Sequence, residues 1–227
     1  MTMKTEAVAM LRRAGRTIGR GFSVLPGVVA RRLGLTFKDW TTRELVVAAV
    51  LSVAVGVIFW GWGLLWSSAF QAIPFPFSYA LVGVWMMGGL LVPYIIRRPG
   101  AALMGELVAA FVSMALGNQW GILTMASGLV QGVGAEVVFG GFRWKRFTGI
   151  ALYGAAALAG GFSILLDIFV YSYYAAYSWG SIGLGAILCI VGSIILGGML
   201  SQLLGEALAR TGVLSGLAIS KGKVKRI

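Results

Sequence analysis

The sequence predicts an all-α integral membrane protein, a bundle of six transmembrane helices with both termini on the cytoplasmic side. Three observations predict this fold: the composition, six long apolar runs, and the one-sided placement of the basic residues. Of 227 residues, 59% are hydrophobic and 11% are charged, and the mean hydropathy is +0.89. Soluble domains have about 45–50% apolar and about 25% charged residues. The composition therefore excludes a soluble enzyme, a disordered chain and, because Cys189 is the single cysteine, a disulfide scaffold.

Six apolar runs follow one another along the chain, separated by short connections with Pro, Gly and polar residues. They cover residues 45–66, 79–96, 101–116, 121–142, 148–170 and 181–204. A helix that crosses a ~30 Å hydrocarbon core needs about 20 mostly apolar residues, so each run predicts one spanning helix, the second slightly short. The third, fourth and fifth runs each hold one acid, and these are Glu106, Glu136 and Asp167.

The basic residues gather in alternate connections. The chain has 19 Lys and Arg against seven Asp and Glu, a formal charge of +12. All 19 lie before the first run, in the connections after the second and fourth runs, or after the last run. The connections 67–78, 117–120 and 171–180 contain none. The positive-inside rule therefore places both termini in the cytoplasm, as an even number of spans requires, and the basic excess faces anionic lipid rather than nucleic acid.

This map divides the chain into a basic cytoplasmic extension at 1–40, a membrane domain at 41–209 and a basic cytoplasmic tail at 210–227. The extension is rich in Arg and poor in acids, which is typical of a tail that contacts anionic lipid. An organelle presequence has a similar composition, and a weakly ordered extension would also fit. A secretory signal is not expected, because no apolar segment of suitable length follows the charges before Trp40.

Small residues four positions apart form stripes where another helix backbone can approach closely. The sixth span carries Ser193, Gly197, Ser201 and Gly205, and the fourth carries Gly128 and Gly132. We expect these two stripes to pack within the bundle. The first span carries Ala48, Ser52 and Gly56 among bulky residues. For this third stripe we expect docking against a helix of another protein.

Ionisable side chains within a span are candidates for function, because burying them costs at least a few kcal/mol. Asp167 lies near the outer end of the fifth span, in register with Ser163 and Tyr171. No basic residue is expected on its side of the membrane, which favours a cationic or amine-bearing ligand. In the fourth span, Gln131 lies on a helix face that runs inward from the outer end. Glu136 lies about 140° further round that helix and is not expected on the same face.

Glu106 and Glu136 have a second interpretation, a structural hydrogen bond or an ion pair with Arg97, Arg98 or Arg143 near the inner surface. The aromatic residues at the outer loops also have two interpretations. An interfacial belt explains part of them. A cage for a flat cationic ring beside an acid explains the rest. The sequence therefore predicts an outward-facing pocket; its candidate substrate-binding residues are Asp167, Tyr171, Trp120, Asn118, Gln119, Gln131, Trp179, Ser163, Glu106 and Glu136.

No cofactor or metal site is predicted, since the chain has no histidine. It also has no phosphate-binding G-x-x-x-x-G-K-[ST] loop and no H-E-x-x-H or G-x-S-x-G motif. A small membrane protein with an outer pocket and no ATPase of its own suggests a substrate-capture subunit.

Several segments resemble a known family. They are WTTRELVVA from Trp40, PYIIRRPGAALMGE from Pro93, QWG from Gln119, GLVQGVGAE from Gly128 and EALARTGVL from Glu206. In this order they resemble the YkoE-type S components of energy-coupling factor (ECF) transporters, over residues 40–214. The resemblance implies capture of thiamine or its hydroxymethylpyrimidine precursor, and partnership with a transmembrane coupling protein and two ATPases in the cell membrane. It also implies that the stripe of Ala48, Ser52 and Gly56 contacts the coupling protein.

Three other functions are compatible with the residues. A stand-alone transporter or channel for another heterocyclic vitamin would work without an ATPase partner. A membrane enzyme would use Glu106 and Glu136 as an acid–base pair, although no nucleophile or metal motif accompanies them. A scaffold that only docks helices would have no use for Asp167.

Overall fold

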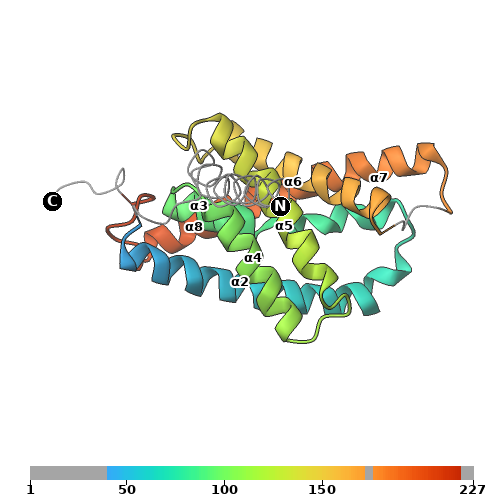
Figure 1. The fold of residues 1–227 in the computed structure, drawn as a ribbon, viewed down its shortest axis with the longest axis horizontal. Coiled ribbons are helices and arrows are strands. Elements are labelled where there is room, and N and C mark those ends of the chain that lie inside the picture. Colours follow the sequence, from blue (N-terminus) through green and yellow to red (C-terminus); the bar gives the residue numbers. More distant parts are fainter. Residues whose placement is uncertain (1–39, 172–175, 221–227) are drawn as a thin grey trace, which may run out of the picture.

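The computed structural model describes residues 40–171 and 176–220, and all regular secondary structure in these ranges is helical (Figure 1). The predicted extension at 1–40, except Trp40, lies outside the described residues, as do the last seven residues of the predicted tail. The elements are α2 (Thr42–Ser68), η2 (Phe70–Ala72), η3 (Phe77–Met86), α3 (Gly88–Ile96), α4 (Ala101–Ala115), α5 (Leu123–Gly141), α6 (Ile150–Phe169), α7 (Trp179–Gly192), η4 (Ser193–Met199) and α8 (Leu200–Arg210).

These helices follow the six predicted runs in order. Five continuous helical stretches are long and apolar enough to cross a membrane, and α4, with 15 residues, is a shorter apolar helix. The all-helical membrane fold is therefore confirmed. In Figure 1 the start of α2 and α8 lie at one end of the long axis, and α7 reaches the other end.

Two of the predicted spans are not uniform α-helices. The second is a ten-residue 3-10 helix, η3, that continues as α3 after Met87. The sixth is a single stretch in which the π-helix η4 separates α7 from α8. A 3-10 helix rises about 2.0 Å per residue against 1.5 Å for an α-helix. The 3-10 geometry therefore lengthens the second span, which is slightly short by its residue count.

α2 begins at a capping box. The Glu44 backbone N–H donates to Thr41 Oγ1 (3.2 Å), and the Thr41 N–H donates to Glu44 Oε2 (2.8 Å). This reciprocal pair satisfies donors that have no partner within the first helical turn. Glu44 also forms an ion pair with Arg98, at 3.0 Å between Oε1 and Nε.

The two faces of α2 differ. Ala48 and Ser52 have no exposed surface, and a Cβ on Gly56 would lie 2.6 Å from Val112 Cβ of α4. The predicted docking stripe is therefore used for packing inside the bundle, where small residues let α2 and α4 approach closely. The opposite face of α2 is apolar and exposed, as at Val50 (63%).

The other two stripes pack within the bundle, as predicted. A Cβ on Gly128 would lie 2.6 Å from Ala110 Cβ, and one on Gly205 would lie 2.6 Å from the Tyr94 ring. Ser193 and Ser201 are fully buried.

The segment after α8 is not simply a charged tail. Leu214, Leu217 and Ile219 are buried in the same core as the helices, and Ser220 Oγ donates to the Leu214 carbonyl oxygen (2.8 Å). Residues 211–220 therefore pack against the helices, because burial of their apolar side chains attaches them to the core.

Candidate binding site

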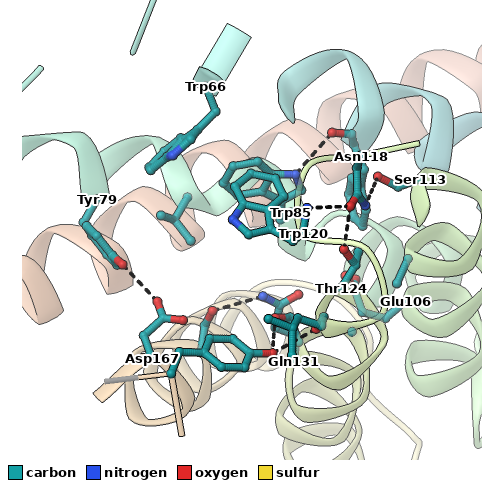
Figure 2. Close-up of a pocket in the computed structure, with 18 residues that line it drawn as sticks. Trp66, Tyr79, Trp85, Glu106, Ser113, Asn118, Trp120, Thr124, Gln131 and Asp167 are labelled. Atoms are coloured by element: carbon teal, nitrogen blue, oxygen red, sulfur yellow. Dashed lines mark hydrogen bonds between the residues drawn. The ribbon is translucent and has the colours of Figure 1, made fainter. Parts of the chain in front are cut away.

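A cavity of about 170 Å³ lies between α2, η3, α4, α5 and α6 (Figure 2). Most of its lining is apolar or aromatic, with a small number of polar groups. This is the usual composition of a small-molecule site. The lining residues are Phe59, Trp66, Tyr79, Val82, Trp85, Glu106, Ala110, Ser113, Asn118, Trp120, Leu123, Thr124, Ser127, Gly128, Gln131, Ser163, Asp167 and Tyr171.

Three polar side chains, one each from α6, α5 and α4, form a buried hydrogen-bond network in the lining of the cavity. The side-chain amide of Gln131 lies 3.0 Å from Ser163 Oγ. With the amide oxygen accepting from Ser163, the amide nitrogen donates to Glu106 Oε1 and to the Trp85 carbonyl oxygen, both at 3.2 Å. Glu106 is 1% exposed, and its Oε2 accepts from the Gly89 backbone N–H at 2.5 Å. One oxygen of Glu106 is therefore held by the backbone, and the other belongs to the polar lining of the cavity.

A second set of hydrogen-bonded side chains lies near the end of α6. Tyr79 Oη donates to Asp167 Oδ2 at 3.0 Å, which joins η3 to α6 across the cavity. Tyr171 Oη donates to the Leu123 carbonyl oxygen at 2.9 Å and lies 3.3 Å from Ser127 Oγ. Figure 2 shows Tyr79 and Asp167 pointing toward one another at one side of the cavity. These contacts connect three helices around the cavity and place a carboxylate on its wall.

Tryptophans form the facing wall. The Trp85 ring centroid lies 5.1 Å from that of Trp66 and 5.1 Å from that of Trp120. Such edge-to-face and tilted pairs are favourable and hold large flat surfaces in place. Trp85 Nε1 donates to the Phe59 carbonyl oxygen at 3.3 Å. A flat ligand ring can stack on the aromatic faces of this wall.

Asn118 has a positioning role in the turn between α4 and α5. Its Oδ1 accepts from the backbone N–H groups of Trp120 (3.0 Å) and Gly121 (2.9 Å) and from Thr124 Oγ1 (2.9 Å). Its Nδ2 donates to Ser113 Oγ at 3.0 Å. These four bonds use most of its capacity, so Asn118 fixes the turn that carries Trp120.

The structure brings most of the candidate residues together. Those that line the cavity are Asp167, Tyr171, Trp120, Asn118, Gln131, Ser163 and Glu106. Gln119, Trp179 and Glu136 do not line it. Gln119 is exposed next to Trp120, and Trp179 is 79% exposed at the start of α7. Both positions suit interfacial side chains better than ligand contacts.

Glu136 belongs to α5 and lies beside the start of α4. Its Oε1 accepts from the Gly100 N–H (2.7 Å) and from Trp144 Nε1 (2.6 Å). Its Oε2 accepts from the N–H groups of Ala102 (3.1 Å) and Leu103 (3.4 Å). The carboxylate therefore caps the start of α4, where backbone donors have no partner within the helix. Of its two predicted interpretations, the structural hydrogen bond is the one observed.

The predicted set of binding residues omitted four aromatic side chains that line the cavity: Phe59, Trp66, Tyr79 and Trp85. Tyr79, Val82 and Trp85 are three residues apart. That spacing puts residues on one face only in a 3-10 helix. The three-residue spacing is visible in the sequence, but with the α-helical period of about 3.6 residues these three side chains are not expected on one face.

Comparisons with known proteins agree with this architecture. Residues 43–162 match a family model described as the permease component of an ABC-type cobalt transport system. A protein of Bacillus subtilis (strain 168) named as an HMP/thiamine permease, YkoE, is 35% identical over 192 residues, which are 83% of this chain and 94% of that protein. A crystal structure of an S-component of an ECF transporter superimposes with a TM-score of 0.77 and 33% identity, over 81% of this chain and 93% of that chain. The chain therefore belongs to the YkoE-type S components of ECF transporters.

Proposed function

We propose that this S component captures thiamine or its hydroxymethylpyrimidine precursor on the outer side of the cell membrane and delivers it inward. The observation that carries the proposal is the cavity, in which a tryptophan wall faces the carboxyl groups of Asp167 and Glu106. Thiamine has a cationic thiazolium ring and a flat aminopyrimidine. Aromatic faces attract flat rings and cations, and carboxylates pair with cations and amines. The relative named as an HMP/thiamine permease supports the same substrate class.

The proposed topology has six crossings and cytoplasmic termini, with α4 as the third crossing. The start of α2, the turn before α4 and the end of α5 lie together, through the Glu44–Arg98 ion pair and the bond from Gly100 to Glu136. Basic residues follow α3, α5 and α8. The positive-inside rule assigns that end to the cytoplasm and the end of α6 that carries Asp167 to the outside.

The proposed partners are a transmembrane coupling protein and two ATPases, because the chain has no nucleotide-binding loop of its own and belongs to the S components. The stripe on α2 is buried against α4. A contact with the coupling protein in this conformation would therefore use exposed apolar side chains.

Ligand titration of the full chain in detergent tests the proposal. Thermal-shift and calorimetric titrations would use thiamine and hydroxymethylpyrimidine, with biotin, riboflavin and cobalt(II) as controls. A ligand that binds only the folded state stabilises it by about 2.7 kcal/mol at a hundredfold excess over Kd. We expect a shift with thiamine or hydroxymethylpyrimidine and none with the controls. Well-folded protein that responds to neither compound would contradict the proposal.

Asp167→Asn tests the carboxylate within the cavity. Loss of a charged contact costs about 1.5–3 kcal/mol, so the affinity for thiamine should fall at least tenfold. Glu206→Gln is the matched control, since Glu206 makes its bonds with Tyr94 and Gln202 away from the cavity lining. Equal affinities in the two variants would remove Asp167 from the site.

A further inference from the structure

The cavity face of η3 exists because η3 is a 3-10 helix. With three residues per turn, Tyr79, Val82 and Trp85 lie one above another, and all three line the cavity. In an α-helix each step of three residues would turn the side chain by about 60°, so Trp85 would point about 120° away from Tyr79. Ten residues is long for a 3-10 helix, since runs beyond three or four residues are uncommon. Something in the bundle must hold this geometry.

The opposite face of η3 meets the sixth span through backbone atoms. A Cβ on Gly83 would overlap the Gly192 carbonyl group, and a Cβ on Gly192 would overlap the Ala80 carbonyl group. One turn further, a Cβ on Gly197 would lie 2.8 Å from the Gly83 carbonyl oxygen. Gly192 is the last residue of α7, and the π-helix η4 follows it. The 3-10 helix and the start of the π-helix are therefore packed backbone to backbone.

Side chains hold the remaining sides of η3. Trp62 Nε1 donates to the Leu81 carbonyl oxygen at 3.0 Å. Glu106 accepts from the Gly89 N–H, close to the junction between η3 and α3. Gly192 itself does not line the cavity. Gly192 contacts η3 at Ala80, so η3 can transmit a change at Gly192 to the cavity.

We propose that Gly83 and Gly192 are positioning residues for the ligand cavity. Their contact keeps η3 in the 3-10 form and thereby keeps Tyr79 and Trp85 in one column against the ligand. This inference rests on the proposed function for its ligand, a flat heterocycle, but the column itself is a property of the protein alone. The contact thereby favours flat ligand rings. Without it, rotation of Trp85 away from Trp66 and Trp120 would break the aromatic wall on which such rings stack.

Gly192→Ala tests the inference, with Gly183→Ala as the matched control on the same helix, where a Cβ meets nothing within 4 Å. The first readout is the circular dichroism of coupled tryptophan rings, measured without ligand. Trp85→Phe identifies the bands that depend on Trp85. We expect Gly192→Ala to lose those bands and Gly183→Ala to keep them. The second readout is calorimetric titration with thiamine and hydroxymethylpyrimidine, in which Gly192→Ala should bind at least tenfold more weakly.

A milder variant keeps the test decisive if Gly192→Ala does not fold. Gly197→Ala presses on the Gly83 carbonyl oxygen at 2.8 Å, and it should change the same bands and the affinity in the same direction by a smaller factor. Unchanged bands and affinity in a folded variant would overturn the inference and leave the proposed function standing. If the wild type binds neither compound, the proposed function fails, and the dichroism alone then decides whether the contact positions Trp85.

Discussion

Two buried glutamates on neighbouring helices, Glu106 and Glu136, differ in the groups that bind their carboxyl oxygens. Glu106 on α4 is 1% exposed and Glu136 on α5 is 7% exposed. Both oxygens of Glu136 are occupied by donors from the start of α4 and from Trp144. Glu106 has one backbone donor, and its other oxygen lies beside Gln131 in the cavity lining. Burial is therefore nearly equal, and the environments of the oxygens are different.

The comparison separates a carboxylate that holds the fold from one that is available to a ligand. At Glu136 the acceptors satisfy backbone groups that would otherwise cost free energy at the end of a helix. At Glu106 one oxygen accepts from the Gly89 N–H and the other from the side-chain amide of Gln131, in the lining of the cavity where we propose that the ligand binds. Four predictions test this separation, from the largest expected effect to the smallest.

Glu136→Ala should cause the largest loss of stability. It removes the acceptor for Gly100, Ala102, Leu103 and Trp144 at once. Each lost bond to a charged group costs about 1.5–3 kcal/mol, with partial recovery through water at this end of the bundle. We expect a loss of at least about 3 kcal/mol, equivalent to about 10 °C in the melting temperature. Thermal unfolding in detergent measures it, and a melting temperature within two degrees of wild type would contradict the capping role.

Glu106→Gln should have the opposite profile. Glutamine keeps an oxygen that accepts from the Gly89 N–H, so the melting temperature without ligand should change little. The affinity for thiamine or hydroxymethylpyrimidine should fall at least tenfold, because an amide NH2 group, which cannot accept a hydrogen bond from a ligand amine, replaces the carboxyl oxygen on the cavity side. Calorimetric titration measures the affinity. A large loss of stability with unchanged affinity would make Glu106 a second structural carboxylate.

Trp120→Ala and Trp179→Ala apply the same separation to two tryptophans, one in the turn between α4 and α5 and one at the start of α7. Trp120 lines the cavity beside Trp85, and Trp179 is 79% exposed. Removing a stacking ring costs about 0.5–1.5 kcal/mol beyond the lost area, so Trp120→Ala should weaken binding by about tenfold. Trp179→Ala should bind within twofold of wild type. A comparable loss at Trp179 would extend the site to the start of α7.

The sequence was sufficient for the helices and for most of the site. Long apolar runs located the five stretches long enough to span and the shorter helix α4 in the described residues, because hydrocarbon forces the backbone to satisfy its own hydrogen bonds. Ser163, Asp167 and Tyr171, which the sequence places in register, all line the cavity. These inferences depend only on helix geometry and composition, which a single chain reveals.

The remaining features depend on which face meets which neighbour. The stripe at Ala48 and Gly56 has the same pattern whether it packs on α4 or on another protein, and only the structure distinguishes them. Trp85 lines the cavity in one column with Tyr79 because η3 is a 3-10 helix, and we propose that packing against Gly192 holds this geometry. Glu136 took a helix cap because the start of α4 lies opposite it.

Trp144→Phe is the smallest step in the comparison, and it isolates one of the donors to Glu136. The substitution keeps an aromatic ring near Gly140 and removes only the indole N–H, which donates to Glu136 Oε1 at 2.6 Å. One bond to a charged acceptor contributes about 1.5 kcal/mol at the low end, so the melting temperature should fall by about 3–6 °C. In the Glu136→Ala background the same substitution should have almost no effect, since the acceptor is already absent. Additive losses in the double variant would mean that Trp144 stabilises the turn by packing, and that backbone donors alone anchor Glu136. Ligand affinity should stay within twofold throughout, because neither residue lines the cavity.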